Sequence, residues 1–389
     1  MAINLPPVKK QKLRGESEDN EEDEEEDTNI AAAVSEAHNT PSPAFFAAAS
    51  SPIIQQRVTT NPSNPLPPYL TRIRHAKQLV IITSDPKHNV RPYKTRADMD
   101  VIEVIEDGGM VIGHDGLIVA VGTDAEIAAK YDTPPIAQAA QSSSGENAPS
   151  SSPTTPLASS FSYQYEVDAS NTCILPGLVD GHTHPVWAGD RVHEFKLKLA
   201  GATYLDIHKA GGGIGFTVQH TREASEAQLL ESLLTRLDRA LRQGTTLLEA
   251  KSGYGLELDT ELKMLKVIQQ AHDMHPVDLV ANYCGAHSVP KGSTADEATK
   301  DIITHQLPEI MRQKVSLGLE TLEMIDVFTE KGIFEIEDSR KILQAGLDHG
   351  LKINFHGDEL SPIQAAELGA ELNATAISHL EHVRKTAST

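Results

Sequence analysis

The hydrophobic pattern divides this 389-residue chain into two parts that predict different structures. Between residues 69 and 136, three segments are rich in β-branched residues: 73–83, 101–113 and 116–122. Asp107-Gly108-Gly109 and Asp115-Gly116 are residue types that hairpin turns favour. The pattern therefore predicts a small antiparallel, β-sandwich-like domain in this N-terminal segment.

From residue 163 onward, buried-strand patterns alternate with amphipathic helices. The predicted strands are 173–184, 245–252, 277–289, 319–329, 351–359 and 374–381. The predicted helices are 225–242, 259–272, 295–314, 335–350 and 362–369. In the first helix, leucines recur on one face, and Ser225 with Gln228 forms a capping box. This alternation predicts an α/β fold with a parallel sheet, and both an open doubly wound sheet and a closed (β/α)₈ barrel fit the pattern.

Two segments have compositions that do not predict a folded core. Residues 1–68 contain an acidic run and a Pro/Ala/Ser/Asn stretch, and we interpret them as a disordered tail. Residues 137–162 are rich in Ser, Pro and Ala and predict a low-complexity insertion. The organised remainder is the small β domain (69–136) and an α/β domain (163–389).

Composition excludes several classes of function. The formal net charge is −21, about half of it in residues 16–27, and such a chain repels phosphates, so we expect no nucleic-acid partner. No apolar stretch approaches the ~20 residues that span a bilayer, so we expect no membrane association. The two cysteines, Cys173 and Cys284, do not form a disulfide framework, which favours a cytoplasmic location.

The motif His182-Thr183-His184 is the strongest chemical signal in the sequence. It ends the first predicted strand of the α/β domain, and residues i and i+2 of a strand point to the same face. Two imidazoles at the carboxyl end of a parallel strand are suited to bind one metal ion. An isolated pair of this kind is also typical of a polar loop, but the surrounding sequence LPGLVDGHTHP favours the metal site.

Other polar residues follow the later strands. His287, His356 and His379 end the third, fifth and sixth predicted strands, and Glu359 comes three residues after His356. Because the carboxyl ends of parallel strands meet at one edge, we expect these side chains to gather there.

Two further side chains are candidates for substrate contact. The loop Lys251-Ser252-Gly253-Tyr254-Gly255 is flanked by glycine, which brings Tyr254 close to a ligand. Arg191 follows the histidine motif and is suited to pair with a carboxylate, although an ordinary surface ion pair would explain it as well.

These residues carry a resemblance to a known family. PGLVDGHTH resembles the metal-binding opening of the amidohydrolase superfamily, whose members are metal-dependent hydrolases with a TIM-like (β/α)₈ barrel. The segments HTHPVWAGDRVHEF, KSGYG, YCGAHSVP and INFHGDE, in that order, are similar to the imidazolonepropionases, with a eukaryotic character. The resemblance extends from about Leu79 to His382, apart from the insertion.

The resemblance implies a role for each candidate residue. The implied metal ligands are His182, His184 and His356, which would hold one Zn²⁺ or Fe³⁺ per subunit. The implied substrate-binding residues are Arg191, Tyr254 and His287. The implied catalytic residues are Glu359 and His379. Lys251 is interpreted as a structural or loop-positioning residue, because the family pattern is mononuclear.

The implied reaction is the hydrolytic ring opening of 4-imidazolone-5-propanoate to N-formimidoyl-L-glutamate in histidine degradation. The partner is then a small-molecule substrate, and a homodimer is possible because family members commonly dimerise. Two other readings fit part of the sequence. One is a related amidohydrolase acting on another ring, and the other is an inactive relative.

The sequence departs from the family pattern at its carboxyl end. Only about six of the eight βα units are present, and the roughly 210 residues after Thr172 are fewer than the ~250 typical of this barrel. In the family, the eighth strand supplies an aspartate that completes the metal site, and it has no counterpart here. We therefore expect a truncated, incomplete barrel that is poorly stable or inactive unless a partner supplies the missing units.

Overall fold

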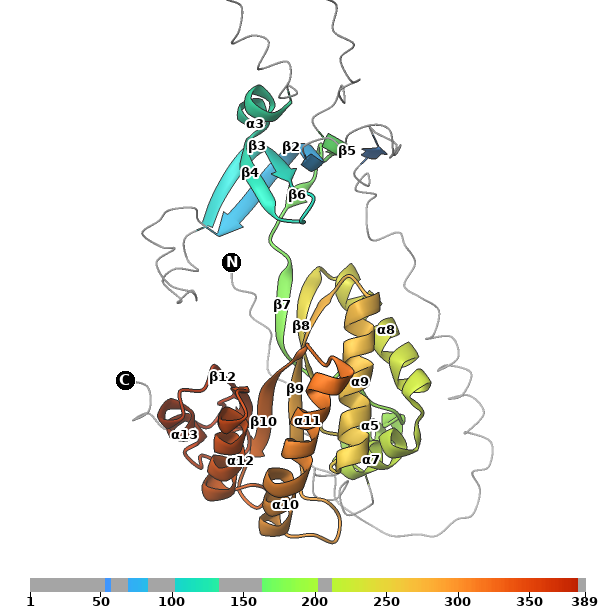
Figure 1. Cartoon of the computed structure of the whole chain (residues 1–389), viewed down its shortest axis with the longest axis vertical. Coiled ribbons are helices and arrows are strands. Elements are labelled where there is room, and N and C mark those ends of the chain that lie inside the picture. The colour runs from blue at the N-terminus through green and yellow to red at the C-terminus, as the bar shows by residue number, and fades with distance from the viewer. Residues whose placement is uncertain (1–52, 57–68, 83–101, 133–162, 202–211, 384–389) are drawn as a thin grey trace, which may run out of the picture. The chain divides into compact units, whose positions relative to one another are not determined.

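The computed structural model describes residues 53–56, 69–82, 102–132, 163–201 and 212–383. The chain divides into two compact units, Met1–Leu175 and Pro176–Thr389 (Figure 1). Most of the predicted tail and insertion lies outside the described residues. The predicted domain boundaries at residues 68, 136 and 162 therefore stay predictions.

The described part of unit 1 contains a six-stranded sheet and one helix. Its strands are β1 (Ile53–Gln56), β2 (Tyr69–Ile82), β3 (Ile102–Ile112), β4 (Ile118–Thr123), β5 (Tyr163–Asp168) and β6 (Cys173–Ile174). The order is β1-β5-β2-β3-β4, and β6 also pairs with β2. Strands β2, β3 and β4 are antiparallel, as predicted, whereas β2 pairs parallel with both β5 and β6. The described part of unit 1 is thus one mixed sheet rather than an antiparallel sandwich.

Helix α3 (Asp124–Tyr131) follows β4 directly in unit 1, and a capping box of Thr123 and Glu126 begins it. At its first residue, the Asp124 carboxylate lies 2.7 Å from Nη2 of Arg72, whose side chain is fully buried. The helix is therefore anchored to β2 by a buried ion pair.

The segment Asp107-Gly108-Gly109 does not form the hairpin turn that the sequence predicts. It lies inside β3, where the pairing with β2 shifts register, and Asp107 has a φ of 47°. A Cβ at Gly109 would lie 2.7 Å from Nη1 of Arg72, so the glycine admits that buried side chain. The second predicted turn, Asp115-Gly116, does connect β3 to β4, and Gly116 has a φ of 80°.

Unit 2 contains a six-stranded parallel sheet surrounded by helices. The strands are β7 (Leu178–Thr183), β8 (Thr245–Lys251), β9 (Asp278–Ala286), β10 (Leu322–Thr329), β11 (Lys352–Gly357) and β12 (Ala376–His379), adjacent in that order. The helices are α5 (Val192–Leu199), α7 (Ile214–Glu223), α8 (Glu226–Arg242), α9 (Leu258–Met274), α10 (Ala295–Asp301), α11 (Leu307–Leu317), α12 (Ile336–Asp348) and α13 (Ala365–Glu371), with a π-helical turn, η3 (Ile302–Gln306), between α10 and α11. Among the described helices, none combines the length and apolarity needed to cross a membrane.

The sheet of unit 2 curls until its two ends nearly meet. Nδ1 of His182 on β7 lies 2.6 Å from Oγ of Ser378 on β12, at the opposite end of the strand order. Asn354 on β11 also donates to the backbone oxygen of Gly181 on β7. The predicted barrel-like α/β fold with six parallel strands is confirmed. Within the described residues, β7 and β12 each pair on one side only.

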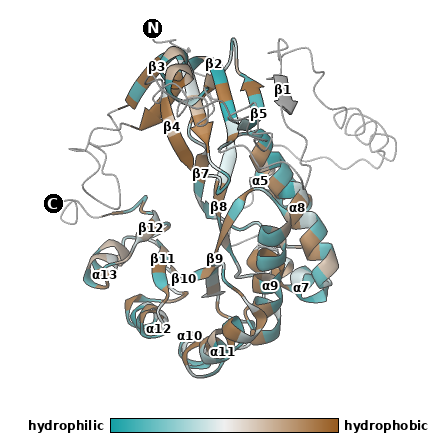
Figure 2. Cartoon of the chain, turned by 45° about the horizontal axis from the view of Figure 1, so that its top comes forward, coloured by the Kyte–Doolittle hydropathy of each residue, from teal (hydrophilic) through white to brown (hydrophobic). Residues whose placement is uncertain are grey.

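Alternating side chains of the central strands point to opposite faces of this curled sheet. On β11, Ile353 and Phe355 belong to the apolar core, whereas Asn354 and His356 are buried but form polar contacts. The same alternation occurs on β8, β9 and β10. Figure 2 shows the helices lying in an arc outside these strands. The sheet therefore has an outer apolar face that carries the helices and a polar inner face.

Helix α8 illustrates how the sequence specifies this packing. Ser225 and Gln228 form the predicted capping box. Leu229, Leu233 and Leu237 recur every fourth residue and are at most 1% exposed. This spacing puts them on the face of the helix that enters the apolar core.

We predict that Leu233→Ala lowers the free energy of unfolding by about 2–5 kcal/mol, because the truncation leaves a cavity in the core. Arg239→Ala, on the exposed side of the same helix, should change it by less than ~0.5 kcal/mol. Urea unfolding followed by circular dichroism measures both. Equal effects of the two substitutions would contradict the assignment of this helix face to the core.

Candidate metal centre

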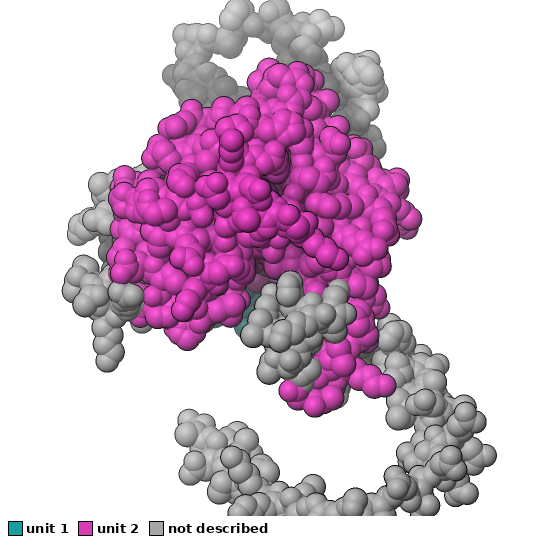
Figure 3. Space-filling model, turned by 90° about the horizontal axis from the view of Figure 1, so that it is seen from below, with its two compact units in different colours: residues 1–175 teal, residues 176–389 magenta. Residues whose placement is uncertain are grey.

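Three histidines meet at the carboxyl ends of β7 and β11. His182 lies in β7, His184 comes directly after it, and His356 lies in β11. Each offers one ring nitrogen, and these three atoms lie within 4.8 Å of one another. The Nε2 atoms of His184 and His356 are 3.1 Å apart. Figure 3 looks onto this end of unit 2. The structure thus brings together the three predicted ligands, although His184 and His356 are 172 residues apart in the sequence.

The donor set fits a metal ion. Nitrogens bound to a tetrahedral zinc at 2.0–2.1 Å lie roughly 3.3 Å from one another, which is close to the spacing of His184 and His356. Nδ1 of His356 is directed at a carboxylate oxygen of Asp326, 2.8 Å away, which leaves Nε2 with its lone pair. Two nitrogens facing each other in this way suit a shared cation. Three imidazoles are ligands that zinc and iron both accept.

The electrostatic setting keeps the rings of His182 and His184 neutral. Burial, followed by the neighbouring His356, lowers the pKa of His182 to about 4. Burial and the adjacent His287 lower the pKa of His184 well below its ordinary value. The neutral imidazole is the form that binds metals, so the site is prepared for a cation at neutral pH.

A second group of potential ligands shares His356 but already holds a cation. Cys284, Asp326 and His356 also offer atoms within 4.8 Å of one another. However, Nζ of Lys251 lies 2.6 Å from Asp326 and 2.5 Å from Glu249. Burial raises the pKa of the Cys284 thiol well above its ordinary value, so the thiolate is disfavoured. The Lys251 ammonium therefore occupies the place beside Asp326 that a second metal would need.

The two neighbouring carboxylates also explain why the Lys251 side chain is charged although it is buried. Its burial disfavours the charge, but Asp326 and Glu249 outweigh that effect and raise the pKa of the ammonium. The protonated amine makes no nucleophile, so the side chain is an internal cation. The interpretation of Lys251 as structural agrees with this position.

His287 and Tyr254 lie beside the three histidines. The His287 ring stacks on that of His184 with 4.5 Å between centroids, and its Nδ1 lies 3.0 Å from the oxygen of Gly253. The Tyr254 ring is 5.2 Å from His287. Gly253 has a φ of 104°, which lets the backbone turn sharply between Lys251 and Tyr254.

The residue that holds this loop is not predicted by any pattern in the sequence. Glu261, fully buried on α9, accepts hydrogen bonds from the backbone N–H groups of Gly253, Gly255 and Leu256. The acidic side chain therefore fixes the loop on which Tyr254 lies. Its distance of five to eight residues from those groups follows no common motif.

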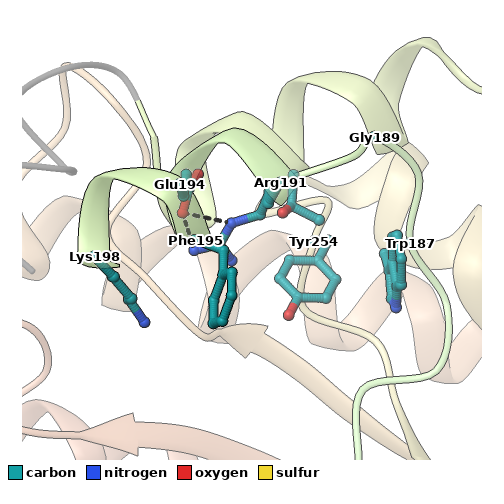
Figure 4. Close-up of a pocket in the computed structure, with 8 residues that line it drawn as sticks. Trp187, Gly189, Arg191, Glu194, Phe195, Lys198 and Tyr254 are labelled. Carbon is teal, nitrogen blue, oxygen red and sulfur yellow. Dashed lines mark hydrogen bonds and ion pairs between the residues drawn. The ribbon is translucent and has the colours of Figure 1, made fainter. Parts of the chain in front are cut away.

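Arg191 lines a pocket of about 390 Å³ next to Tyr254 (Figure 4). The other lining residues are Trp187, Gly189, Glu194, Phe195, Lys198 and Thr217. Nε and Nη2 of Arg191 both donate to Oε2 of the buried Glu194, whose Oε1 accepts the N–H of Gly213 at the start of α7. Glu194 therefore fixes the guanidinium at the wall of a pocket that also contains aromatic rings.

Glu359 and His379 lie side by side at the carboxyl ends of β11 and β12. Oε2 of Glu359 is 3.4 Å from Nε2 of His379. The His379 ring lies 5.0 Å from that of His182 and 5.2 Å from that of His356, measured between centroids. His379 has a φ of 76°, an uncommon backbone conformation for a non-glycine residue that is often found at functional sites.

The neighbouring acid, Asp358, binds backbone N–H groups and has a structural role. It is 1% exposed and accepts hydrogen bonds from the N–H groups of Ile363, Ala365 and Ala366, at the start of α13. Glu330, at the end of β10, likewise accepts from Leu360. These two carboxylates anchor the loop that carries Glu359, and the sequence pattern did not single them out.

No protein-family model matches the chain. Comparison with curated proteins does give close relatives. The chain is 51% identical over 311 residues to a probable imidazolonepropionase of Danio rerio, covering 80% of this chain and 64% of the relative. The chain belongs to the imidazolonepropionase family. Probable imidazolonepropionases of Mus musculus and Homo sapiens are 50% and 48% identical, and the match covers 80% of this chain and 66% of each.

The chain thus spans slightly less than two thirds of the length of these relatives. Among solved structures, a guanine deaminase from C. acetobutylicum with bound guanine is 12% identical, with a TM-score of 0.44 over 82% of this chain and 64% of that one. Similarity this distant does not identify a reaction. The family assignment rests on the sequence identities.

The buried histidines predict an acid-sensitive fold. Burial and the neighbouring His356 lower the pKa of His287 to about 3. Below pH ~6.5 the unfolded chain therefore binds more protons than the folded chain, and the free energy of unfolding should decrease as the pH falls toward 3. A single histidine contributes at most ~1.4 kcal/mol per pH unit to that slope.

We predict that His287→Gln reduces this slope in the metal-free chain, and that His349→Gln, at an exposed position after α12, leaves it unchanged. Urea unfolding of chelator-treated protein between pH 7 and pH 4 measures it. Parallel curves for the wild type and His287→Gln would contradict the buried, neutral state of this ring.

Proposed function

We propose that the chain catalyses the hydrolytic ring opening of 4-imidazolone-5-propanoate to N-formimidoyl-L-glutamate, a step of histidine degradation. The observation that carries the proposal is the three-histidine centre beside the Arg191 pocket. The relatives named as probable imidazolonepropionases support the choice of ring. The chain spans less than two thirds of those relatives, and the inactivity expected of an incomplete barrel is the outcome that would contradict this proposal.

In this proposal, His182, His184 and His356 hold one Zn²⁺ or Fe³⁺ per subunit. When bound, the ion supplies Lewis-acid chemistry, which makes water more acidic and polarises a carbonyl. The neutral rings of His182 and His184 and the spacing of the ring nitrogens support this assignment.

Arg191, Tyr254 and His287 are proposed to bind the substrate. The Arg191 guanidinium, which Glu194 holds at the wall of the pocket, matches the charge of a propionate. His287 and Tyr254 lie between this pocket and the histidine centre, where they suit contact with the imidazolone ring. The substrate would then span from Arg191 to His184.

Glu359 and His379 are proposed to move the proton. Hydrolysis adds a hydroxyl to the carbonyl carbon, breaks the carbon–nitrogen bond of the ring and requires one proton to travel from water to the leaving nitrogen. A carboxylate and an imidazole 3.4 Å apart, next to the ligand histidines, are suited to accept that proton and deliver it.

A cytoplasmic location is part of the proposal. It is supported by two free cysteines, of which Cys284 is buried and Cys173 is exposed. The homodimer stays a prediction, because the described residues give no evidence about assembly.

The central prediction is turnover that depends on the histidine centre. Purified chain loaded with Zn²⁺ or Fe³⁺ should remove the imidazolone absorbance and yield N-formimidoyl-L-glutamate by mass spectrometry. His182→Ala should lose both stoichiometric metal and turnover, because two imidazoles bind far more weakly than three. The Danio rerio relative provides the reference rate, and His349→Gln is the matched histidine control.

Metal analysis separates the two parts of this proposal. Stoichiometric metal with an intact ring, under conditions in which the relative turns over, would rule out the activity for this chain while retaining the metal site. No metal in the wild type would rule out both.

A second prediction concerns Arg191. If its guanidinium anchors the propionate equally in the ground and transition states, Arg191→Ala raises KM roughly 10- to 100-fold, the loss of a charged hydrogen bond, with little change in kcat. Arg191→Lys should recover part of the loss, and Arg239→Ala on α8 should have no effect. The dissociation constant of the product, measured by calorimetry, gives the same comparison without turnover. A decrease in kcat alone would contradict an anchoring role.

A further inference from the structure

The buried carboxylate of Asp326 on β10 contacts both a histidine of the metal centre and a buried lysine. Oδ1 of Asp326 accepts hydrogen bonds from the backbone N–H of His356, at 3.1 Å, and from its Nδ1, at 2.8 Å. Oδ2 of the same carboxylate pairs with Nζ of Lys251, at 2.6 Å. Asp326 is 1% exposed and Lys251 is fully buried. The carboxylate therefore has one oxygen for the histidine and one for an internal cation.

The contact with Nδ1 determines which nitrogen of His356 carries the proton. A carboxylate accepts but does not donate, so Nδ1 must be the protonated nitrogen. Nε2 then keeps its lone pair, 3.1 Å from Nε2 of His184. Because Oδ1 also binds the backbone N–H of the same residue, both the ring and the strand position are fixed by one atom.

The other two histidines of the centre are held differently. Nδ1 of His182 contacts the Ser378 hydroxyl, which donates or accepts and so does not select a tautomer. Nδ1 of His184 has no hydrogen-bond partner within the described part of the chain. Of the three, His356 is thus the one whose protonation pattern is dictated by a charged neighbour.

Lys251 keeps the carboxylate in place. Its ammonium also pairs with Oε1 of Glu249, which accepts from the Asn282 side chain as well. These residues lie on β8 and β9, so the cation ties Asp326 on β10 to two preceding strands. An aspartate held from one side by a buried ammonium has little freedom to turn away from His356.

We propose that Asp326 is a positioning residue that fixes His356 with Nε2 directed at the metal position, and that Lys251 is the internal counter-ion that fixes Asp326. This inference rests on the metal centre of the proposed function. It adds a group that contacts neither metal nor substrate but sets the geometry of one ligand.

The first test reads the tautomer without metal. Histidine ¹⁵N nuclear magnetic resonance of the chelator-treated full chain, with His356→Gln to assign the signal, should show His356 protonated at Nδ1. Asp326→Asn should produce a mixture of tautomers, because its amide nitrogen competes for the position facing Nδ1 or meets the Lys251 ammonium. His356 protonated at Nε2 in the wild type would overturn the proposal.

The second test reads the affinity for the ion. Competition with a chelator should show Zn²⁺ binding that is roughly 10- to 100-fold weaker in Asp326→Asn than in the wild type. Asp124→Asn is the matched control, since it removes a buried carboxylate paired with an arginine in unit 1 and should leave the affinity unchanged. Wild-type affinity in Asp326→Asn would overturn the proposal.

Cobalt substitution tests the competing ligand set. With Co²⁺ in place of zinc, the wild type should show no thiolate-to-metal charge-transfer band, and Cys284→Ser should leave the spectrum unchanged. A band that disappears in Cys284→Ser would make Cys284 a ligand, would favour the alternative set of Cys284, Asp326 and His356, and would overturn the positioning role.

These outcomes are separable from the fate of the proposed function. A wild type that binds no metal removes the metal centre, whereas the tautomer measurement still decides whether Asp326 fixes His356. If Asp326→Asn does not fold, the double variant Lys251→Met/Asp326→Asn removes both charges together. Without the Lys251 ammonium to hold residue 326, the amide oxygen should fix the His356 ring less firmly, so Zn²⁺ should bind more weakly than in the wild type. Wild-type affinity would again contradict the proposal.

Discussion

Enclosing the Lys251 ammonium between Glu249 and Asp326 is the constraint on which the interior of unit 2 depends. Removing such charges from water costs several kcal/mol per ion, and their attraction offsets that cost only when the geometry is maintained. β8 and β10 are not neighbours, since β9 lies between them. The ion cluster therefore connects three consecutive strands, and Asp326 of the same cluster holds His356.

The alternation of strand residues separates stability from chemistry. Residues such as Ile353 and Phe355 face the helices and form the apolar core, and their polar neighbours Asn354 and His356 form the inner network. A substitution on the outer face alters packing, whereas one on the inner face alters the position of a ligand. Loop anchors such as Glu261 and Asp358 extend this network to the carboxyl edge, where the candidate site lies.

Sequence reasoning reached the strands and the pair His182 and His184 because both follow local rules, whereas the choice of His356 as the third ligand came from the family resemblance. The pair His182 and His184 follows from spacing on a single strand, and α8 follows from its capping box and leucines. The roles of Asp326 and Glu261 were not predicted, because their partners lie five or more residues away on other elements. The sequence position of a buried acid does not indicate which group it contacts. The turn predicted at Asp107-Gly108-Gly109 was wrong for a related reason. Gly108 and Gly109 accommodate Leu79 and Arg72 within a strand, and such glycines have the same composition as a turn.

The ligands of the centre come from β7 and β11, which are far apart in the chain and nearly at opposite ends of the sheet. An ion that needs both can bind tightly only to molecules in which the whole sheet is assembled. Binding and folding are then one linked equilibrium: free ion at 100 times its dissociation constant adds about 2.7 kcal/mol to the stability of the assembled state. The availability of the ion during synthesis would thus influence how much of this protein stays folded, as well as how much of it has the ion bound.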